Sequence, residues 1–209
     1  MQTKYKLAIF DFDGTLADSF PFFMRVFNQI AEQHGFKTID PDSASNFRHY
    51  TAKQLMKEVG LPTWKLPFVA KNFISLMQQN QSSISLFGHV DEMLLHLSNA
   101  GVMLAIVSSN SYDNISQVLG PTNTNLMREF ECGMSIFGKA SRIKKVLKKT
   151  GIAPHEAIYI GDQVMDLEAA RKENVAFGAV AWGYGAIESL RAHTPEHEFH
   201  HVLEIQKIV

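Results

Sequence analysis

The chain has 209 residues, 45% of them hydrophobic and 20% charged, which suits one sizeable soluble domain or a core domain with a modest insertion. Its 20 Lys and Arg against 21 Asp and Glu leave a formal net charge of -1. This balance gives no general electrostatic reason to bind nucleic acid or an anionic membrane. The single cysteine, Cys132, excludes an intrachain disulfide and a Cys-based zinc site.

Apolar runs in the chain are short. The run nearest the amino terminus covers only 7–10, far less than the hydrophobic region of a signal peptide. Elsewhere no run approaches the length of a membrane span. We therefore expect a soluble, cytoplasmic protein with no membrane partner and no nucleic-acid partner. The sequence leaves its oligomeric state open.

The first predicted element is a buried strand over 7–10, followed by a long helical segment. In this segment apolar residues recur at helical spacing, as in Phe20, Phe23 and Phe27, and prolines interrupt the pattern as expected between short helices. We interpret 16–85 as a small all-α cap domain. The core domain is then expected to consist of 1–15 and 86–209.

The remainder of the chain alternates helices with strands. Short apolar runs between helical patterns are typical of a parallel sheet that is buried on both faces. We therefore predict an α/β fold with a Rossmann-like, doubly wound parallel sheet. In chain order the expected elements are a helix over 90–99, a strand over 102–107, a weaker strand around 131–136, a helix over 141–150, a strand over 157–160, a helix over 162–174 and a strand over 175–181.

Two carboxylates, Asp11 and Asp13, follow the first predicted strand directly. Ligands of open α/β sheets bind at the carboxyl ends of the strands. One carboxylate could act as a nucleophile and the other as an acid and base, while their mutual repulsion calls for a cation or a protonated partner. Asp and the following Gly14 are also common turn residues, so this motif alone leaves an ordinary turn as an alternative.

Two further sets of polar residues lie at the ends of predicted elements, one after a strand and one at the start of a helix. Ser108, Ser109 and Asn110 follow the strand 102–107, where they can bind phosphate oxygens, although an ordinary helix cap explains them equally well. Lys139 lies at the entrance of a predicted helix, where its charge opposes the helix dipole unless a negative group lies close. A solvated surface lysine is the alternative interpretation.

The last acidic motif contains Asp162 and Asp166, after the strand 157–160. If both residues are helical, their spacing places them on one face of the helix. Carboxylates at the end of a strand suit a hard cation such as Mg²⁺. An aspartate cap with a second acid in the first turn is the alternative.

The order of these four motifs along an alternating α/β chain resembles the haloacid dehalogenase superfamily, and the resemblance covers essentially the full chain. Asp13 favours the phosphatases of that superfamily, because its dehalogenases lack this second acid. The position of the helical insertion and the run 182–185, Trp-Gly-Tyr-Gly, further resemble phosphoglycolate-phosphatase-like proteins. The chain is therefore expected to be a phosphoric monoester hydrolase.

The resemblance also implies roles for single residues. Asp11 would attack phosphorus to form an aspartyl-phosphate, and Asp13 would protonate the leaving group and later activate water. Lys139 would neutralise charge on Asp11 and on the phosphate. Mg²⁺ is the implied cofactor, with Asp11, the Asp13 carbonyl and Asp162 as ligands and Asp166 as a further acid at the metal.

The implied substrate is a small phosphorylated metabolite. By the resemblance, Ser108 and Lys139 would bind its phosphoryl group, and Ser109 and Asn110 would shape the adjoining loop. Arg48, in the insertion, is the best candidate for the distal group of the substrate, because a guanidinium suits a carboxylate or second phosphate.

Two other functions remain open. A phosphomutase of the β-phosphoglucomutase type would use the same residues but return the phosphoryl group to a sugar. A regulatory binding protein would keep the fold without turnover. Within the insertion, Trp64 is expected to pack rather than to bind substrate.

Overall fold

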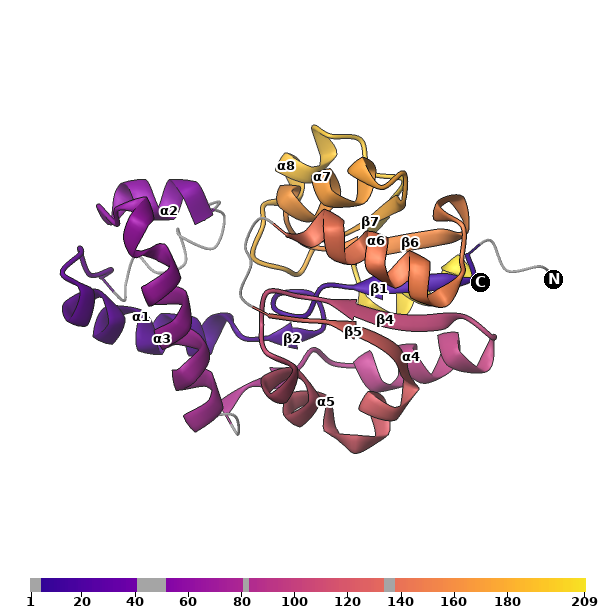
Figure 1. The fold of residues 1–209 in the computed structure, drawn as a ribbon, viewed down its shortest axis with the longest axis horizontal. Helices are drawn as coiled ribbons and strands as arrows, with labels where there is room; N and C mark the ends of the chain where they lie inside the picture. Colours follow the sequence, from indigo (N-terminus) through magenta and orange to yellow (C-terminus); the bar gives the residue numbers. More distant parts are fainter. Residues whose placement is uncertain (1–4, 41–51, 81–82, 134–137) are drawn as a thin grey trace.

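The computed structural model describes residues 5–40, 52–80, 83–133 and 138–209. At its centre lies a six-stranded parallel sheet with helices on both faces (Figure 1). The strands of this sheet are β1 (Leu7–Phe10), β4 (Met103–Val107), β5 (Met127–Glu131), β6 (Ala157–Gly161), β7 (Ala176–Val180) and β8 (His197–Phe199). The predicted α/β fold with a doubly wound parallel sheet is thereby confirmed. Among the described residues, none of the helices has the length and apolar character needed to span a bilayer.

Strand β1 shows why its apolar run is continuous. All four of its side chains are fully buried, since successive residues point to opposite faces and each face is covered. Leu7 and Ile9 pack in one cluster, and Ala8 and Phe10 pack in the other. The helices on the Ala8 and Phe10 face are α4 (Val90–Asn99), α5 (Tyr112–Leu126) and the 3-10 helix η5 (Val202–Ile208). Those on the opposite face are α6 (Lys139–Thr150), α7 (Val164–Lys172) and α8 (Ile187–Arg191).

The strand order is β5-β4-β1-β6-β7-β8, so the chain builds outward from β1 in one direction and then in the other. Strand β1 pairs in parallel with both β4 and β6. The side on which successive strands are added therefore changes at β1. A crevice is expected there, at the carboxyl ends of these three strands. Asp11 lies at this point, and its backbone N–H still donates to the Ile160 carbonyl at 2.9 Å.

The helical insertion lies beside the carboxyl edge of the sheet (Figure 1). Its elements are α1 (Phe20–His34), α2 (Ala52–Glu58), the 3-10 helix η2 (Thr63–Lys65) and α3 (Leu66–Gln79). The two connections to the core run side by side, because β2 (Ala17–Asp18) pairs antiparallel with β3 (Ser85–Leu86). This pairing agrees with the expected position of the cap, while the domain boundaries at 15/16 and 85/86 stay a prediction.

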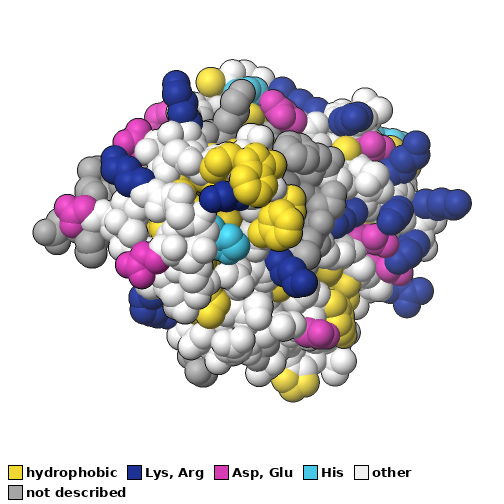
Figure 2. All heavy atoms as spheres, turned by 60° about the vertical axis from the view of Figure 1, so that its left-hand side comes forward, with side chains coloured by type: hydrophobic (Ala, Val, Ile, Leu, Met, Phe, Trp, Pro, Cys, Tyr) yellow, Lys and Arg dark blue, Asp and Glu magenta, His cyan; other side chains and the backbone are white. Residues whose placement is uncertain are grey.

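Exposed aromatic side chains lie on the insertion. Trp64 is 67% exposed and Phe68 is 61% exposed, and the Lys65 Nζ lies 5.4 Å from the centroid of the Trp64 ring. Figure 2, which brings the left-hand side of Figure 1 forward, shows hydrophobic side chains gathered on this side of the molecule. Trp64 is therefore not a packed side chain as expected, and the expectation that it does not bind substrate stays a prediction.

Other differences from the expected elements have local causes. The strand expected around 131–136 overlaps β5 only at Glu131, where β5 ends, and 134–137 lie outside the described residues. Helix α5 was not predicted, because its helical path is interrupted at Gly120 (φ 72°, ψ 166°), just before Pro121, and its apolar periodicity is weak. Strand β8 was also missed, since three residues carry too short a pattern. A further 3-10 helix among the described residues is η4 (Pro154–Glu156).

Candidate active site

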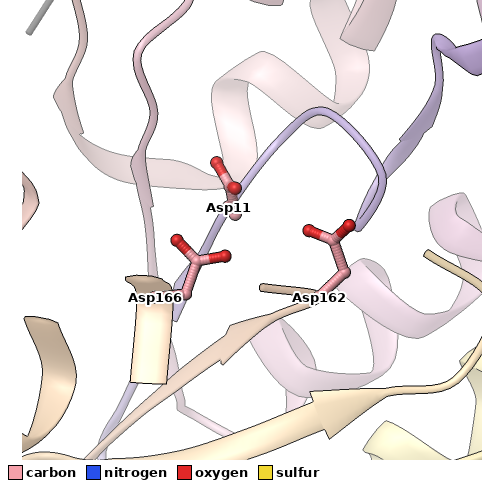
Figure 3. Close-up of side chains that lie close together, drawn as sticks. All are labelled: Asp11, Asp162 and Asp166. Atoms are coloured by element: carbon pink, nitrogen blue, oxygen red, sulfur yellow. The ribbon is translucent and has the colours of Figure 1, made fainter. Parts of the chain in front are cut away.

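Three buried carboxylates meet at the carboxyl ends of β1 and β6. Asp11, Asp162 and Asp166 each offer an oxygen, and these oxygens lie within 4.8 Å of one another (Figure 3). Asp11 follows β1, Asp162 follows β6, and Asp166 lies in the first turn of α7. Such a concentration of buried negative charge is unfavourable unless cations or protons compensate it.

Lys139 supplies one compensating charge. Its Nζ donates to Asp11 Oδ2 at 2.6 Å and also forms an ion pair with Asp166 Oδ1. Burial alone would lower the pKa of Lys139, but the Asp11 and Asp166 carboxylates hold that pKa well above its usual range. Lys139 is the first residue of α6, so the negative groups that its position called for are present.

Asp162 has one oxygen without a protein partner. Its Oδ2 accepts a hydrogen bond from the Tyr184 backbone N–H at 2.8 Å, whereas Oδ1 is buried and has no hydrogen-bond partner. Burial raises the pKa of Asp162 to about 8, and the charges of Asp166 and Asp11 add to this rise. An orphaned carboxylate oxygen beside two other acids fits a hard divalent cation such as Mg²⁺.

Asp162 and Asp166 lie close together, but not because they share one face of a helix. Helix α7 begins at Val164, so Asp162 precedes the helix and the two residues do not share one of its faces. Asp166 takes part in a capping box, in which its Oδ2 accepts from the Gln163 N–H at 3.2 Å. The turn between β6 and α7, rather than helical spacing, brings the two carboxylates together.

Asp13 is held from two sides. The Ser19 hydroxyl donates to Asp13 Oδ1 at 2.6 Å, and the Asn110 amide donates to Oδ2 at 3.0 Å. Burial nevertheless raises the pKa of Asp13 to about 6, against the lowering effect of the Ser19 hydrogen bond. A carboxyl group with a pKa in this range can both release and accept a proton near neutral pH.

The three residues predicted to bind or adjoin the phosphate, Ser108, Ser109 and Asn110, lie in different environments. Ser108 is buried at the end of β4, and its Oγ accepts from the Asn110 backbone N–H at 3.2 Å. Ser109 is half-buried. Asn110 contacts Asp13 instead of only shaping the adjoining loop. Arg48 lies outside the described residues.

Sequence reasoning missed two residues at this site. Arg142 is buried and donates to the Ser108 carbonyl at 2.8 Å and to the Gly133 carbonyl at 2.6 Å. It therefore ties α6 to the loop that follows β4. Tyr184 was singled out only as part of the run 182–185, yet its backbone contacts Asp162 and its hydroxyl contacts Ser19.

The glycine at 185 allows a close approach to Asp162. A β-carbon on Gly185 would lie 2.1 Å from the Asp162 carbonyl oxygen, which is backbone and cannot turn aside. The activity expected from the sequence motifs is Mg²⁺-dependent phosphate release. Gly185→Ala should displace Asp162 and reduce this expected activity by about 10²-fold, as a displacement of about 1 Å does in active sites. It should also raise the Mg²⁺ concentration for half-maximal activity.

Gly88→Ala is the matched control for this substitution, because a β-carbon on Gly88 would meet no atom within 4 Å. It should retain wild-type rates. Steady-state rates over a range of Mg²⁺ concentrations provide the measurement. Wild-type rates and an unchanged Mg²⁺ requirement in Gly185→Ala would show that the close approach is unimportant.

Comparison with known proteins agrees with this geometry. The sequence profile of haloacid dehalogenase-like hydrolases matches residues 8–180, which include every acidic residue of the site. The chain belongs to this family. The resemblance inferred from the sequence motifs is therefore confirmed.

Individual relatives cover nearly the whole chain. A phosphoglycolate phosphatase from Synechococcus elongatus is 30% identical over 189 residues, which are 90% of this chain and 89% of the relative. An N-acetylmuramic acid 6-phosphate phosphatase from Pseudomonas aeruginosa is 23% identical over 91% of this chain and 88% of its own length. A haloacid dehalogenase-like hydrolase from Streptococcus pneumoniae shares the fold, with a TM-score of 0.81 at 22% identity over 98% of both chains.

Proposed function

We propose that this haloacid dehalogenase-like hydrolase is a Mg²⁺-dependent phosphatase that cleaves a small phosphate monoester through an aspartyl-phosphate on Asp11. The contact of the Lys139 ammonium with the buried Asp11 carboxylate, beside the orphaned oxygen of Asp162, is the observation that carries this proposal. It combines a fixed carboxylate with positive charge, in the place where a phosphate dianion would otherwise be repelled.

Phosphate release would take two displacements. An Asp11 oxygen forms a bond to phosphorus while the ester P–O bond breaks, and the leaving oxygen takes the proton held by Asp13. A water molecule then gives a proton to Asp13 as its oxygen attacks phosphorus. The bond between Asp11 and phosphorus breaks, which releases inorganic phosphate and restores both acids.

The remaining residues hold the reacting groups in place. The Phe12 N–H donates to Asp11 Oδ1 at 2.8 Å, and together with Lys139 it fixes the orientation of the carboxylate. Ser108 is the residue we assign to the transferring phosphoryl group. Asp11, Asp162 and the Asp13 carbonyl would hold Mg²⁺, which when bound supplies positive charge to the phosphate oxygens. Asp166 would then fix Lys139 and complete the acidic cluster.

The substrate class rests on the relatives. Proteins named as phosphatases of phosphoglycolate and of N-acetylmuramic acid 6-phosphate support the expected enzyme class, a phosphoric monoester hydrolase. Both named substrates are small phosphate monoesters with further polar groups. We propose a substrate of this kind, with Arg48 as the residue that binds its distal anionic group.

A panel of phosphate monoesters tests this function. We expect phosphate release from small carboxylated or sugar esters with Mg²⁺ and almost none with a chelator. Activation by substoichiometric sugar bisphosphate, with an isomerised sugar phosphate as the product, would instead indicate a mutase. If folded protein with Mg²⁺ leaves every ester intact, a binding protein without turnover replaces the proposal.

Mg²⁺ binding should depend on pH, because the acids must lose their protons. Burial raises the pKa of Asp162 to about 8 and that of Asp166 to about 6. Since both values exceed those of unfolded carboxyls, the metal-free fold should lose stability as the pH rises through this range. Mg²⁺ affinity should rise by about tenfold per pH unit below 8.

Thermal unfolding with and without Mg²⁺ between pH 6 and 9 measures both effects. The rise in melting temperature on adding Mg²⁺ should be largest at the alkaline end. An Mg²⁺-induced shift that is the same at every pH would show that these acids do not release protons on binding.

A further inference from the structure

We propose that Tyr184 is a positioning residue for Asp13, acting through the hydroxyl of Ser19. This inference rests on the proposed function, in which Asp13 exchanges protons with the leaving group and with water. Nothing in the motif that contains Asp13 points to Tyr184, which lies 165 positions away from Ser19 in the chain. The two hydroxyls nevertheless meet in the fold.

The direction of these hydrogen bonds follows from the number of available protons. Ser19 has one hydroxyl proton, which it donates to Asp13 Oδ1 at 2.6 Å. When Asp13 is ionised, as it must be before it takes a proton from water, its carboxylate can only accept. The contact between the Tyr184 hydroxyl and Ser19 Oγ must then have Tyr184 as the donor. The result is a directed chain from Tyr184 through Ser19 to Asp13. Such a chain polarises the serine hydroxyl and strengthens its bond to the carboxylate.

The Ser19 side chain does not act as a helix cap, although its position would allow it. It occupies the N-cap position of α1, where a serine side chain usually accepts from a backbone N–H of the first turn. Here it makes no such bond, and it is 98% buried, with a relative exposure of 2%. Ser19 therefore does not cap α1 with its side chain. Its hydroxyl serves Asp13 and Tyr184 instead.

Both the backbone and the ring of Tyr184 make contacts that hold the residue in place. Its backbone N–H donates to Asp162 Oδ2 at 2.8 Å, and its ring lies 5.4 Å from the ring of Phe20, the first residue of α1. One residue thus connects the acidic cluster, the proposed acid and base, and the beginning of the helical insertion. On the other side of Asp13, the Asn110 amide donates to Oδ2. The two donors together define one orientation of the carboxyl group.

A double-mutant cycle tests the hydrogen-bonded connection from Tyr184 through Ser19 to Asp13, because removal of either hydroxyl breaks this same connection. Tyr184→Phe keeps the ring and the backbone N–H to Asp162 but removes the hydroxyl. We expect it to lower kcat by about tenfold, part of the effect of a general acid and base, while KM and the Mg²⁺ requirement stay unchanged. Ser19→Ala should lose at least as much kcat. In the Ser19→Ala background, Tyr184→Phe should add less than about a twofold loss.

Tyr5→Phe is the matched control, since it removes a tyrosine hydroxyl that contacts His197 away from the site. It should keep wild-type kcat. Unchanged kcat in Tyr184→Phe, losses that multiply in the double variant, or equal changes in kcat and the Mg²⁺ requirement would each overturn the proposal. If Tyr184→Phe does not fold, Ser19→Ala with full kcat overturns it equally.

A second measurement separates this inference from the proposed function. If the wild-type protein hydrolyses no ester, the proposed function fails, but crystal structures still test the chain of hydroxyls. We expect the wild type to show Ser19 between Tyr184 and Asp13, and both Tyr184→Phe and Ser19→Ala to show a reoriented Asp13 carboxyl group. An Asp13 carboxyl with the same orientation in all three structures would refute the positioning role.

Discussion

Replacing Asp11 by Asn is expected to reduce phosphate release by at least about 10³-fold, or about 4 kcal/mol of transition-state stabilisation. The substitution preserves shape: the Asn carbonyl oxygen can still accept from the Phe12 N–H, as Asp11 Oδ1 does. It removes the negative oxygen that contacts Lys139 at 2.6 Å. An amide at this place is a poor nucleophile towards phosphorus, so the first displacement should stop.

The size of this effect separates two roles for Asp11. A metal ligand alone would leave activity that high Mg²⁺ concentrations restore, because the other acids of the cluster remain. A nucleophile cannot be restored in this way. Initial rates of phosphate release should therefore be measured over a wide range of Mg²⁺ concentrations. Asp113→Asn, at an exposed position in the first turn of α5, is the control and should retain full activity.

Turnover of Asp11→Asn at the wild-type rate would remove Asp11 from the reaction. Recovery of the wild-type rate at high Mg²⁺ would leave it only a metal ligand. Both results would require another group to attack phosphorus, and the buried acids Asp162 and Asp166 would become the first residues to examine.

Lys139→Ala should lower kcat by about 10²-fold or more, comparable to the removal of one preorganised donor in other active sites. The Lys139 ammonium contacts both Asp11 and Asp166. Among the described residues it is the cation nearest to the acidic cluster. Without it, the carboxylate of Asp11 and the substrate phosphate would repel each other more strongly. The carboxylates would also be left buried with one cation fewer.

The same variant should therefore unfold more easily as the pH rises. Breaking a buried ion pair by removing one partner costs about 3–5 kcal/mol, and protonation of the remaining acids relieves that cost. Burial raises the pKa of Asp166, and the Lys139 charge opposes that rise, so the loss of Lys139 should raise the pKa of Asp166 further. Stability should therefore fall more steeply from pH 5 to 8 than in the wild type. Melting temperatures across this range measure the effect.

Lys144→Ala is the matched control, since Lys144 belongs to the same helix but is exposed. It should change neither kcat nor the pH dependence of stability. A Lys139→Ala variant with wild-type kcat would refute the proposed electrostatic role. If that variant lost activity but showed the same pH dependence of stability as the wild type, the ion pairs would matter less to folding than their burial implies.

The sequence predicted the sheet and the acids at its edge because both depend on local signals. A strand that is buried on both faces is a continuous apolar run, so β1 was predicted with the bounds that the structure shows. Parallel strands bring their carboxyl ends to one edge, and this places Asp11 and Asp162 close together once the strands are known. The position of Lys139 at a helix entrance left two interpretations open, a nearby negative group or a solvated surface lysine, and its contacts with Asp11 and Asp166 decide for the first.

Contacts between distant segments could not be predicted in this way. Arg142 looks like another cation of a basic helix, and only the tertiary structure brings the Ser108 and Gly133 carbonyls to its guanidinium. Ser19, a serine directly before a helix, looks like an ordinary side-chain cap from its local sequence alone, but its side chain makes no such bond. Tyr184 becomes informative only when the loop after β7 meets the connection that leads to α1.

A covalent phosphoenzyme on Asp11 is the most direct test of the proposed chemistry. Wild-type protein would be mixed with an ester that it hydrolyses and that carries the radiolabel on phosphorus, and would be quenched rapidly in acid. One part of the sample would be counted for protein-bound label, and the other would be treated with borohydride, which reduces an aspartyl-phosphate to homoserine and releases its phosphate. We predict protein-bound label in the wild type, homoserine at position 11, and neither in Asp11→Asn. Label or homoserine at another position, or undiminished label in Asp11→Asn, would contradict Asp11 as the nucleophile.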